Sequence, residues 1–178
     1  MLGIILLATI SLFSLSILYT TLRTGISPMP SSAQVRHVIL EISEQASDEG
    51  VVIDFGSGWG GLLFALARKY PERQIIGYEL SWLPWIYSQI CKTIFRLHNL
   101  SFYRQDFVHA DLPAANLLIC YLHPKGMQRL QKKLEQQQTR ALLISNTFAL
   151  PDNQPIETIR LNDLYNTPIY IYRLNNSF

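Results

Sequence analysis

The chain has 178 residues, enough for one domain, and 48% of them are hydrophobic, so material for a core is ample. Its formal net charge of only +2 gives no reason to expect nucleic acid as a partner. Cys91 and Cys120 lie in apolar runs without C-x-x-C spacing, and the four histidines are isolated. We therefore expect buried, reduced thiols and no metal centre.

The N-terminal run is long enough to cross a membrane. Leu2 to Leu22 carries no charge and consists mainly of Leu and Ile, and about 20 such residues span a bilayer as a helix. No basic residue precedes the run, whereas Arg23 and Arg36 follow it, which favours an uncleaved anchor over a cleaved signal peptide. We expect a transmembrane anchor at 1–23, a linker at 24–31 and a domain at 32–178 on the cytoplasmic or matrix-equivalent side.

Helix-like and strand-like runs alternate through the domain. The patterns predict helices at 32–48, 62–70, 81–99 and 125–138, and strands at 51–55, 74–79, 101–104, 116–121 and 141–145. Two alternating runs, 156–161 and 167–173, are joined by a polar connection and predict an antiparallel hairpin. The fold expected is α/β, a doubly wound, mostly parallel sheet closed by a C-terminal hairpin, with its ligand beyond the strands' carboxyl ends.

One of these helices is unusually rich in aromatic residues. Ser81 is the expected N-cap, and Ile86, Ile90 and Ile94 recur at helical spacing. The aromatic residues at its start are more often core residues than a stacking site, so we expect them to be buried. These residues are Trp82, Trp85 and Tyr87.

The first strand runs into a glycine-rich turn. Asp54 is followed by Gly56, Gly58 and Gly60, then by a helical run, and Glu79 ends the next strand. Glycines allow a tight turn and a close approach of a ligand to the start of the helix, and an acidic residue about 20 positions later often binds a ribose hydroxyl. The same residues fit a dinucleotide fingerprint and motif I of class I S-adenosylmethionine-dependent methyltransferases. A dehydrogenase would need a further half-domain that this chain has no room for, which favours S-adenosyl-L-methionine.

Four segments extend the resemblance beyond the fold. They are Asp54–Gly60, Gly77–Tyr87, Arg104–Phe107 and Tyr121–Met127. In this order they resemble the small membrane-anchored protein-lysine methyltransferases related to those of the mitochondrial ATP synthase c subunit and the adenine nucleotide translocase. The resemblance implies a Rossmann-like class I domain behind a hydrophobic segment, lysine methylation, and a protein substrate that can itself be membrane-embedded.

The resemblance also assigns roles to individual residues. It implies that Gly56, Gly58 and Gly60 closely approach the methionine part of the cofactor, and that Asp54 bonds nearby backbone or the cofactor's amino group. Glu79 would bind both ribose hydroxyls. Asp106 would face the adenine amino group. The alternatives without a role in cofactor binding are a cap of the glycine loop for Asp54, an exposed strand end for Glu79 and a turn aspartate for Asp106.

Two residues at the end of the fourth strand are the candidate catalytic pair. Tyr121 and His123 would face the transferring methyl group, and His123 would accept or orient a lysine proton. A lone loop histidine is the alternative. The expected function is a membrane-anchored protein-lysine methyltransferase. The alternatives are methylation of a lipid or small molecule, or an inactive nucleotide-binding module retained for interaction.

Overall fold

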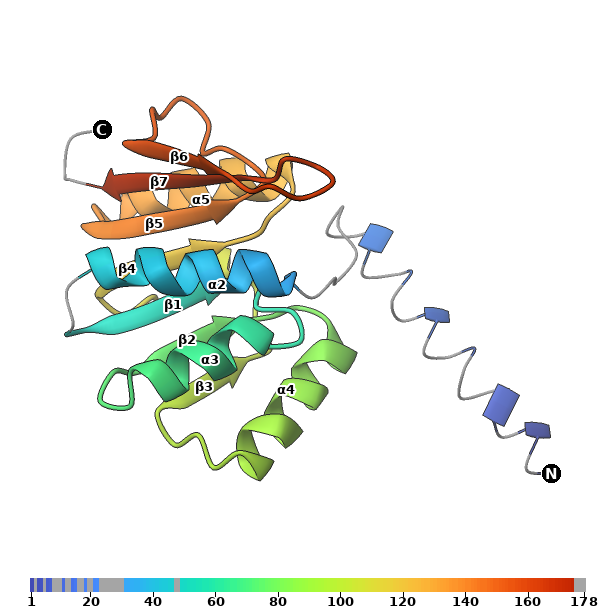
Figure 1. Ribbon diagram of the computed structural model, residues 1–178. Helices are drawn as coiled ribbons and strands as arrows, with labels where there is room; N and C mark the ends of the chain where they lie inside the picture. Colours follow the sequence, from blue (N-terminus) through green and yellow to red (C-terminus); the bar gives the residue numbers. More distant parts are fainter. Residues whose placement is uncertain are drawn as a thin grey trace.

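The computed structural model describes residues 31–46 and 49–174, together with isolated positions among the first 22 residues. Within this part of the chain, one seven-stranded sheet carries helices on both faces (Figure 1). The helices are α2 (Ala33–Ile42), α3 (Gly61–Lys69), α4 (Trp82–Ile94) and α5 (Pro124–Gln136), with short 3₁₀ turns η1 (Ser43–Gln45) and η2 (Phe107–His109). The strands are β1 (Val51–Phe55), β2 (Ile75–Tyr78), β3 (Leu100–Tyr103), β4 (Ala115–Cys120), β5 (Ala141–Asn146), β6 (Glu157–Arg160) and β7 (Pro168–Leu174).

The order of the strands is β3-β2-β1-β4-β5-β7-β6. The first five strands of this order run parallel, and β7 pairs antiparallel with both β5 and β6. The last strand of the chain therefore lies inside the sheet, between its two neighbours. The expected α/β sheet with a C-terminal antiparallel hairpin is confirmed.

The sheet separates two apolar layers. Neighbouring residues of β1 point to opposite faces, so Val52 packs with α2 and α3 on one side and Ile53 packs toward α5 on the other. The central strands are buried almost throughout, which explains their nearly continuous apolar sequence. Cys91 and Cys120 are both free and buried, as expected. Between these two layers, the carboxyl ends of the parallel neighbours β1 and β4 lie side by side at the same edge of the sheet.

The first helix of the domain is shorter than its pattern predicted. It ends at Ile42 and is followed by the 3₁₀ turn η1, whereas the prediction extended it to about residue 48. The Ser43 hydroxyl donates to the Leu40 carbonyl at 2.6 Å and bonds the Tyr70 hydroxyl at 2.8 Å. A serine side chain that bonds nearby backbone competes with helix continuation, which accounts for the early end.

Helix α4 corrects the expectation that its aromatic residues are buried. Trp82 is 53% exposed and Tyr87 is 48% exposed, so both predictions of burial were wrong. Trp85 is half-buried and its indole donates to the Phe102 carbonyl at 3.2 Å. The residues that face inward are small or weakly polar: Pro84, Ser88 and Cys91. Periodicity located the apolar stripe correctly, but it did not say which side of the helix meets the sheet.

The predicted anchor at 1–23 and linker at 24–31 fall largely outside the described residues. In the portions that are described, no helix combines the length and the apolar character that a membrane crossing requires.

Candidate functional site

The glycine turn between β1 and α3 is fixed by backbone hydrogen bonds to the neighbouring strand. The N–H groups of Gly56 and Ser57 both donate to the Tyr78 carbonyl at 2.9 Å. The Gly58 N–H donates to the Glu79 carboxylate at 2.8 Å, with a φ of 53° that favours glycine. The turn is therefore a defined shape, held open at the carboxyl end of β1.

Gly60 is required by packing as well as by conformation. Its φ is 76°, and a Cβ there would come within 2.7 Å of the Phe102 ring and 2.9 Å of the Ser88 hydroxyl. Both contacts are closer than any ordinary Cβ contact, so the helix start could not approach α4 and β3 with a side chain in this place. The expected role of Gly60 was contact with the cofactor, and the structure supplies this separate reason for a glycine.

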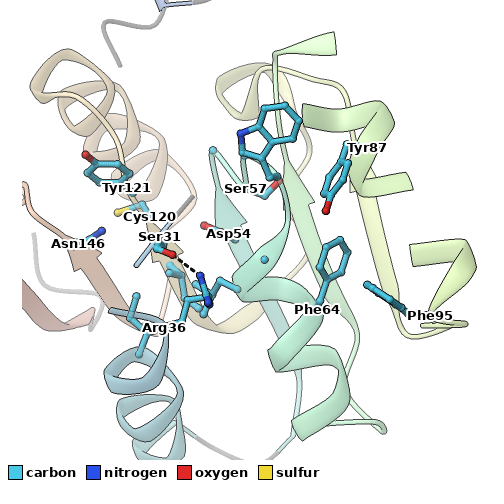
Figure 2. A pocket seen from close by; sticks show the side chains of 17 residues that line it. Ser31, Arg36, Asp54, Ser57, Phe64, Tyr87, Phe95, Cys120, Tyr121 and Asn146 are labelled. Atoms are coloured by element: carbon cyan, nitrogen blue, oxygen red, sulfur yellow. Dashed lines mark hydrogen bonds between the residues drawn. The ribbon is translucent and has the colours of Figure 1, made fainter. Parts of the chain in front are cut away.

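A cavity of about 450 Å³ opens beside the turn, within the range typical of ligand sites (Figure 2). It lies at the carboxyl ends of β1 and β4, between α2, the start of α3 and α4. Its lining combines glycine backbone, aromatic rings and a few polar groups. The predicted residues in the lining are Asp54, Gly56, Gly58 and Tyr121. The predicted residues Gly60, Glu79, Asp106 and His123 do not line it.

Asp54 is the buried acid of this cavity. Its side chain points into the site (Figure 2), it is only 6% exposed, and no described residue donates a hydrogen bond to its carboxylate. Burial, and secondarily the charge of Glu79, raise the pKa of Asp54 from an ordinary 3.8 to about 7. A cationic group placed in the cavity would supply the missing partner and favour the ionised carboxylate.

Arg36 is a site residue that the sequence did not reveal. It comes from α2, lines the same cavity as Asp54, and donates from its guanidinium to the Ser31 carbonyl at 2.5 Å (Figure 2). Among the described residues that line the cavity, Arg36 is the cation and Asp54 is the acid. The only sequence signal was a basic residue one turn into a helix that leads to β1, which is too common to single out.

Glu79 and Asp106 lie outside the cavity lining and have partners of their own. Glu79 is buried, and its two carboxylate oxygens accept from the N–H groups of Gly58, at 2.8 Å, and Ser81, at 2.6 Å. Asp106 accepts from the Val108 N–H at 3.1 Å and from Arg129 at 2.6 Å. Glu79 thus links the glycine turn to the start of α4, and Asp106 fixes the turn after β3.

Tyr121 and His123 share an aromatic neighbour at the carboxyl end of β4. The ring centroids of Tyr121 and Phe148 lie 6.2 Å apart and nearly parallel, and the His123 ring lies 6.2 Å from the same Phe148. The backbone of His123 forms the N-cap of α5, without a side-chain capping bond. Phe148 was missed because it follows β5, in a loop where an aromatic residue has no periodic signal.

Asn146 is a further cavity residue that the sequence prediction omitted. It ends β5, is 6% exposed and lines the cavity opposite the glycine turn. A signal existed, since polar residues at the carboxyl ends of parallel strands commonly face the ligand. Cys120 also lines the cavity, but burial raises the pKa of its thiol to about 12, so it offers no thiolate near neutral pH.

Residues 54–157 match the family model of the ANTKMT methyltransferase domain. The chain belongs to this family. It is an S-adenosylmethionine-dependent methyltransferase, as the sequence predicted, and S-adenosyl-L-methionine is its cofactor. Among curated protein sequences, none matches significantly.

Solved structures show the same fold for this methyltransferase. An RNA methyltransferase of Salinibacter ruber bound to S-adenosyl-L-homocysteine is 21% identical, with a TM-score of 0.71 over 84% of this chain and 96% of that one. A precorrin-6y C5,15-methyltransferase of Geobacter metallireducens is 12% identical, with a TM-score of 0.60 over 80% and 87%. A SAM-dependent methyltransferase of Aquifex aeolicus is 11% identical, with a TM-score of 0.57 over 78% and 88%. At these identities the likeness shows the fold alone.

The residues present fit the cofactor of this methyltransferase family. The methionine part of S-adenosylmethionine carries an ammonium and a carboxylate, and the cavity provides the acid Asp54 and the guanidinium of Arg36. Asp54 is a buried carboxylate that lacks a donor among the described residues, which a bound ammonium would provide. The aromatic rings of Phe64, Tyr87 and Phe95 give the cavity apolar walls for the rest of the molecule.

Proposed function

We propose that this methyltransferase methylates a lysine side chain of a protein and is tethered to a membrane by residues 1–23. The observation that carries the lysine proposal is the match of residues 54–157 to the ANTKMT methyltransferase domain. The resemblance of Tyr121–Met127 to membrane-anchored lysine methyltransferases agrees with it. The charge-free run Leu2–Leu22 supports the tether.

The cofactor is held, in this proposal, mainly through its methionine part. Asp54 accepts from the ammonium, Arg36 binds the carboxylate, and the backbone of Gly56 and Gly58 lies against the chain that joins them. Their positions in one lining support this assignment.

The proposed contacts to the nucleoside use acids whose oxygens already accept bonds within the protein. Glu79 accepts one N–H on each oxygen, and a carboxylate oxygen has a further lone pair with which to receive a ribose hydroxyl. Asp106 would accept from the adenine amino group in this proposal and would keep its bond to Arg129. Gly60 contributes by allowing the close packing of the turn.

The reaction needs alignment and a neutral amine more than a strong acid or base. S-adenosylmethionine supplies a methyl group already activated on a sulfonium. An acceptor lysine would have to lose a proton to expose the lone pair that receives this methyl group. His123 accepts that proton, while Tyr121 and Phe148 flank the amine and exclude water.

The proposed tether affects the concentration of substrate. A domain held at a bilayer meets membrane proteins at a high effective concentration without extra binding contacts. The basic residues Arg23 and Arg36 after the apolar run favour the cytoplasmic or matrix-equivalent side for the domain.

The proposal is tested by methyl transfer to membranes. The full chain is incubated with S-adenosylmethionine labelled in its methyl group and a membrane fraction, and the proteins are hydrolysed to amino acids. Label in methylated lysine, absent with a His123→Ala variant that still binds S-adenosylhomocysteine, is the expected result. Label found only in the lipid extract would overturn the protein-lysine assignment and favour a lipid acceptor.

A further inference from the structure

The outward face of α4 carries a continuous apolar stripe. Trp82, Ile86, Ile90 and Ile94 follow one another every four residues, which places them on one side of an α-helix. Their exposed fractions lie between 40% and 68%. A surface helix normally turns its apolar side toward the core, and α4 turns this stripe away from it.

Two further exposed aromatic residues of this region line the cofactor cavity. Tyr87 and Phe95 are exposed by 48% and 45%, and both also line the cavity (Figure 2). We define the α4 patch as the six residues Trp82, Ile86, Tyr87, Ile90, Ile94 and Phe95. Exposed apolar side chains gathered along one helix and its C-cap in this way mark an interaction site.

Cations lie at both ends of the α4 patch. The Arg104 guanidinium is 4.1 Å from the centre of the Trp82 ring, and the Arg68 guanidinium is 4.6 Å from that of Phe95. Between Glu79 and Asp106 the sequence contains no acidic residue, but it contains Lys92, Arg96 and Arg104. The partner that complements this surface is therefore apolar in its interior and anionic at its rim.

We propose that the α4 patch docks on the surface of an anionic lipid bilayer. Exposed Ile side chains would enter the boundary between headgroups and acyl chains, with Trp82 and Tyr87 at the level that amphipathic aromatic rings prefer. Arg104 and Arg68 would remain among the lipid phosphates, where each basic residue favours binding about five-fold. Figure 1 shows α4 along the β3 side of the sheet, where its outer face is not covered by another described element.

The α4 patch is separate from the proposed anchor at 1–23, and its docking would fix the orientation of the domain relative to the membrane. An anchor alone leaves the domain free to turn above the membrane. Docking through α4 would bring the cavity wall formed by Tyr87 and Phe95 to the lipid surface, so that the cavity opens next to targets at that depth. The inference does not depend on which group is methylated.

The experiment measures tryptophan quenching by brominated phospholipid in vesicles that contain the full chain. A stripe variant, Ile86→Glu with Ile90→Glu, is compared with a control, Gln128→Glu with Gln136→Glu, which adds the same charge at exposed positions of α5. Folding of each is verified by circular dichroism. Phosphatidylcholine vesicles are compared with vesicles that also contain phosphatidylglycerol.

We expect wild type and control to be quenched alike, more strongly with phosphatidylglycerol, and the stripe variant to lose about half of the quenched signal or more. If the stripe variant does not fold, the dependence of the wild type on phosphatidylglycerol remains as the test. Equal quenching of both variants, or no effect of anionic lipid, would overturn the proposal. So would concentration-dependent self-association abolished by the stripe substitutions, since a second copy would then be the occupant. None of these measurements requires cofactor binding or methyl transfer. A negative result for lipid docking would therefore be distinct from a failure of the proposed function.

Discussion

Replacement of Asp54 by Asn tests two effects of this buried acid separately: its effect on the free energy of unfolding and its contribution to cofactor binding. The pKa of the folded-state carboxyl is raised from 3.8 to about 7, so the folded protein keeps a proton that the unfolded chain releases at lower pH. A difference of about three pH units corresponds to roughly 4 kcal/mol, at about 1.4 kcal/mol per unit. Because the folded state binds more protons in this window, its stability falls as the pH rises from about 4 to 7.

The expected result for Asp54→Asn is that this decrease disappears. The free energy of unfolding of the variant, minus that of wild type, should grow by up to about 4 kcal/mol between pH 4 and pH 8. Denaturant unfolding of the full chain in mild detergent, at a series of pH values, measures this difference. The exposed Asp152→Asn serves as a control for the removal of a surface carboxylate.

The same variant should lose affinity for the cofactor. A hydrogen bond to a charged group contributes about 1.5–3 kcal/mol, so S-adenosylhomocysteine should bind about 10- to 100-fold more weakly to Asp54→Asn. Wild-type affinity should rise with pH through about 7, as the carboxyl ionises. Calorimetric titration measures both effects. An Asn variant that binds as tightly as wild type, with the same pH profile, would refute the assignment of Asp54 to the ammonium.

Three further predictions concern the rest of the site. Gly60→Ala should destabilise the fold by about 3 kcal/mol or more, because its new Cβ would clash with Phe102 at a φ of 76°. Gly58→Ala, whose Cβ would meet no atom within 4 Å, should cost only about 1–2 kcal/mol. Thermal unfolding of both variants measures the difference, and equal losses of stability would contradict the packing argument. Burial raises the pKa of Asp106, but the bonds from Arg129 and the Val108 N–H lower it on balance from its ordinary value of 3.8. Arg129→Met should therefore cost at most about 1 kcal/mol near neutral pH, and this cost should fade as the pH falls through the lowered pKa of Asp106. Unfolding near neutral pH and in acid would show the difference. His123→Ala should lower kcat about 100-fold or more with the Kd for S-adenosylhomocysteine unchanged, and a matched loss of affinity would place His123 in the cofactor site instead.

The alternation of patterns predicted the sheet because each strand and helix has its own period. Continuous apolar runs at 116–121 and 141–145 indicated strands buried on both faces, and the hairpin followed from alternation at 156–161 and 167–173. The glycine turn was also predictable from the sequence, because Gly58 and Gly60 occupy backbone conformations that few other residues adopt. Local physics was enough for these elements.

The other site residues are brought together by contacts between elements that are far apart in the sequence. A local sequence pattern does not predict such contacts. Arg36 becomes a cavity residue only because α2 lies against the carboxyl end of β1, and Phe148 meets Tyr121 only because β5 is next to β4. The same limit explains the error at Trp82. A helical stripe states which residues share a face, and the docking of the helix decides whether that face is inside.

The place of β7 bears on how the chain is made. A strand that lies between β5 and β6 but comes last in sequence cannot join the sheet until nearly the whole domain has left the ribosome. Until then β5 presents unpaired backbone groups along the apolar run Ala141–Asn146, and β6, which pairs only with β7 among the described strands, has nothing to join. An open apolar strand edge is the feature that chaperones protect and that aggregation exploits. The nascent chain is therefore most vulnerable just before residues 168–174 emerge.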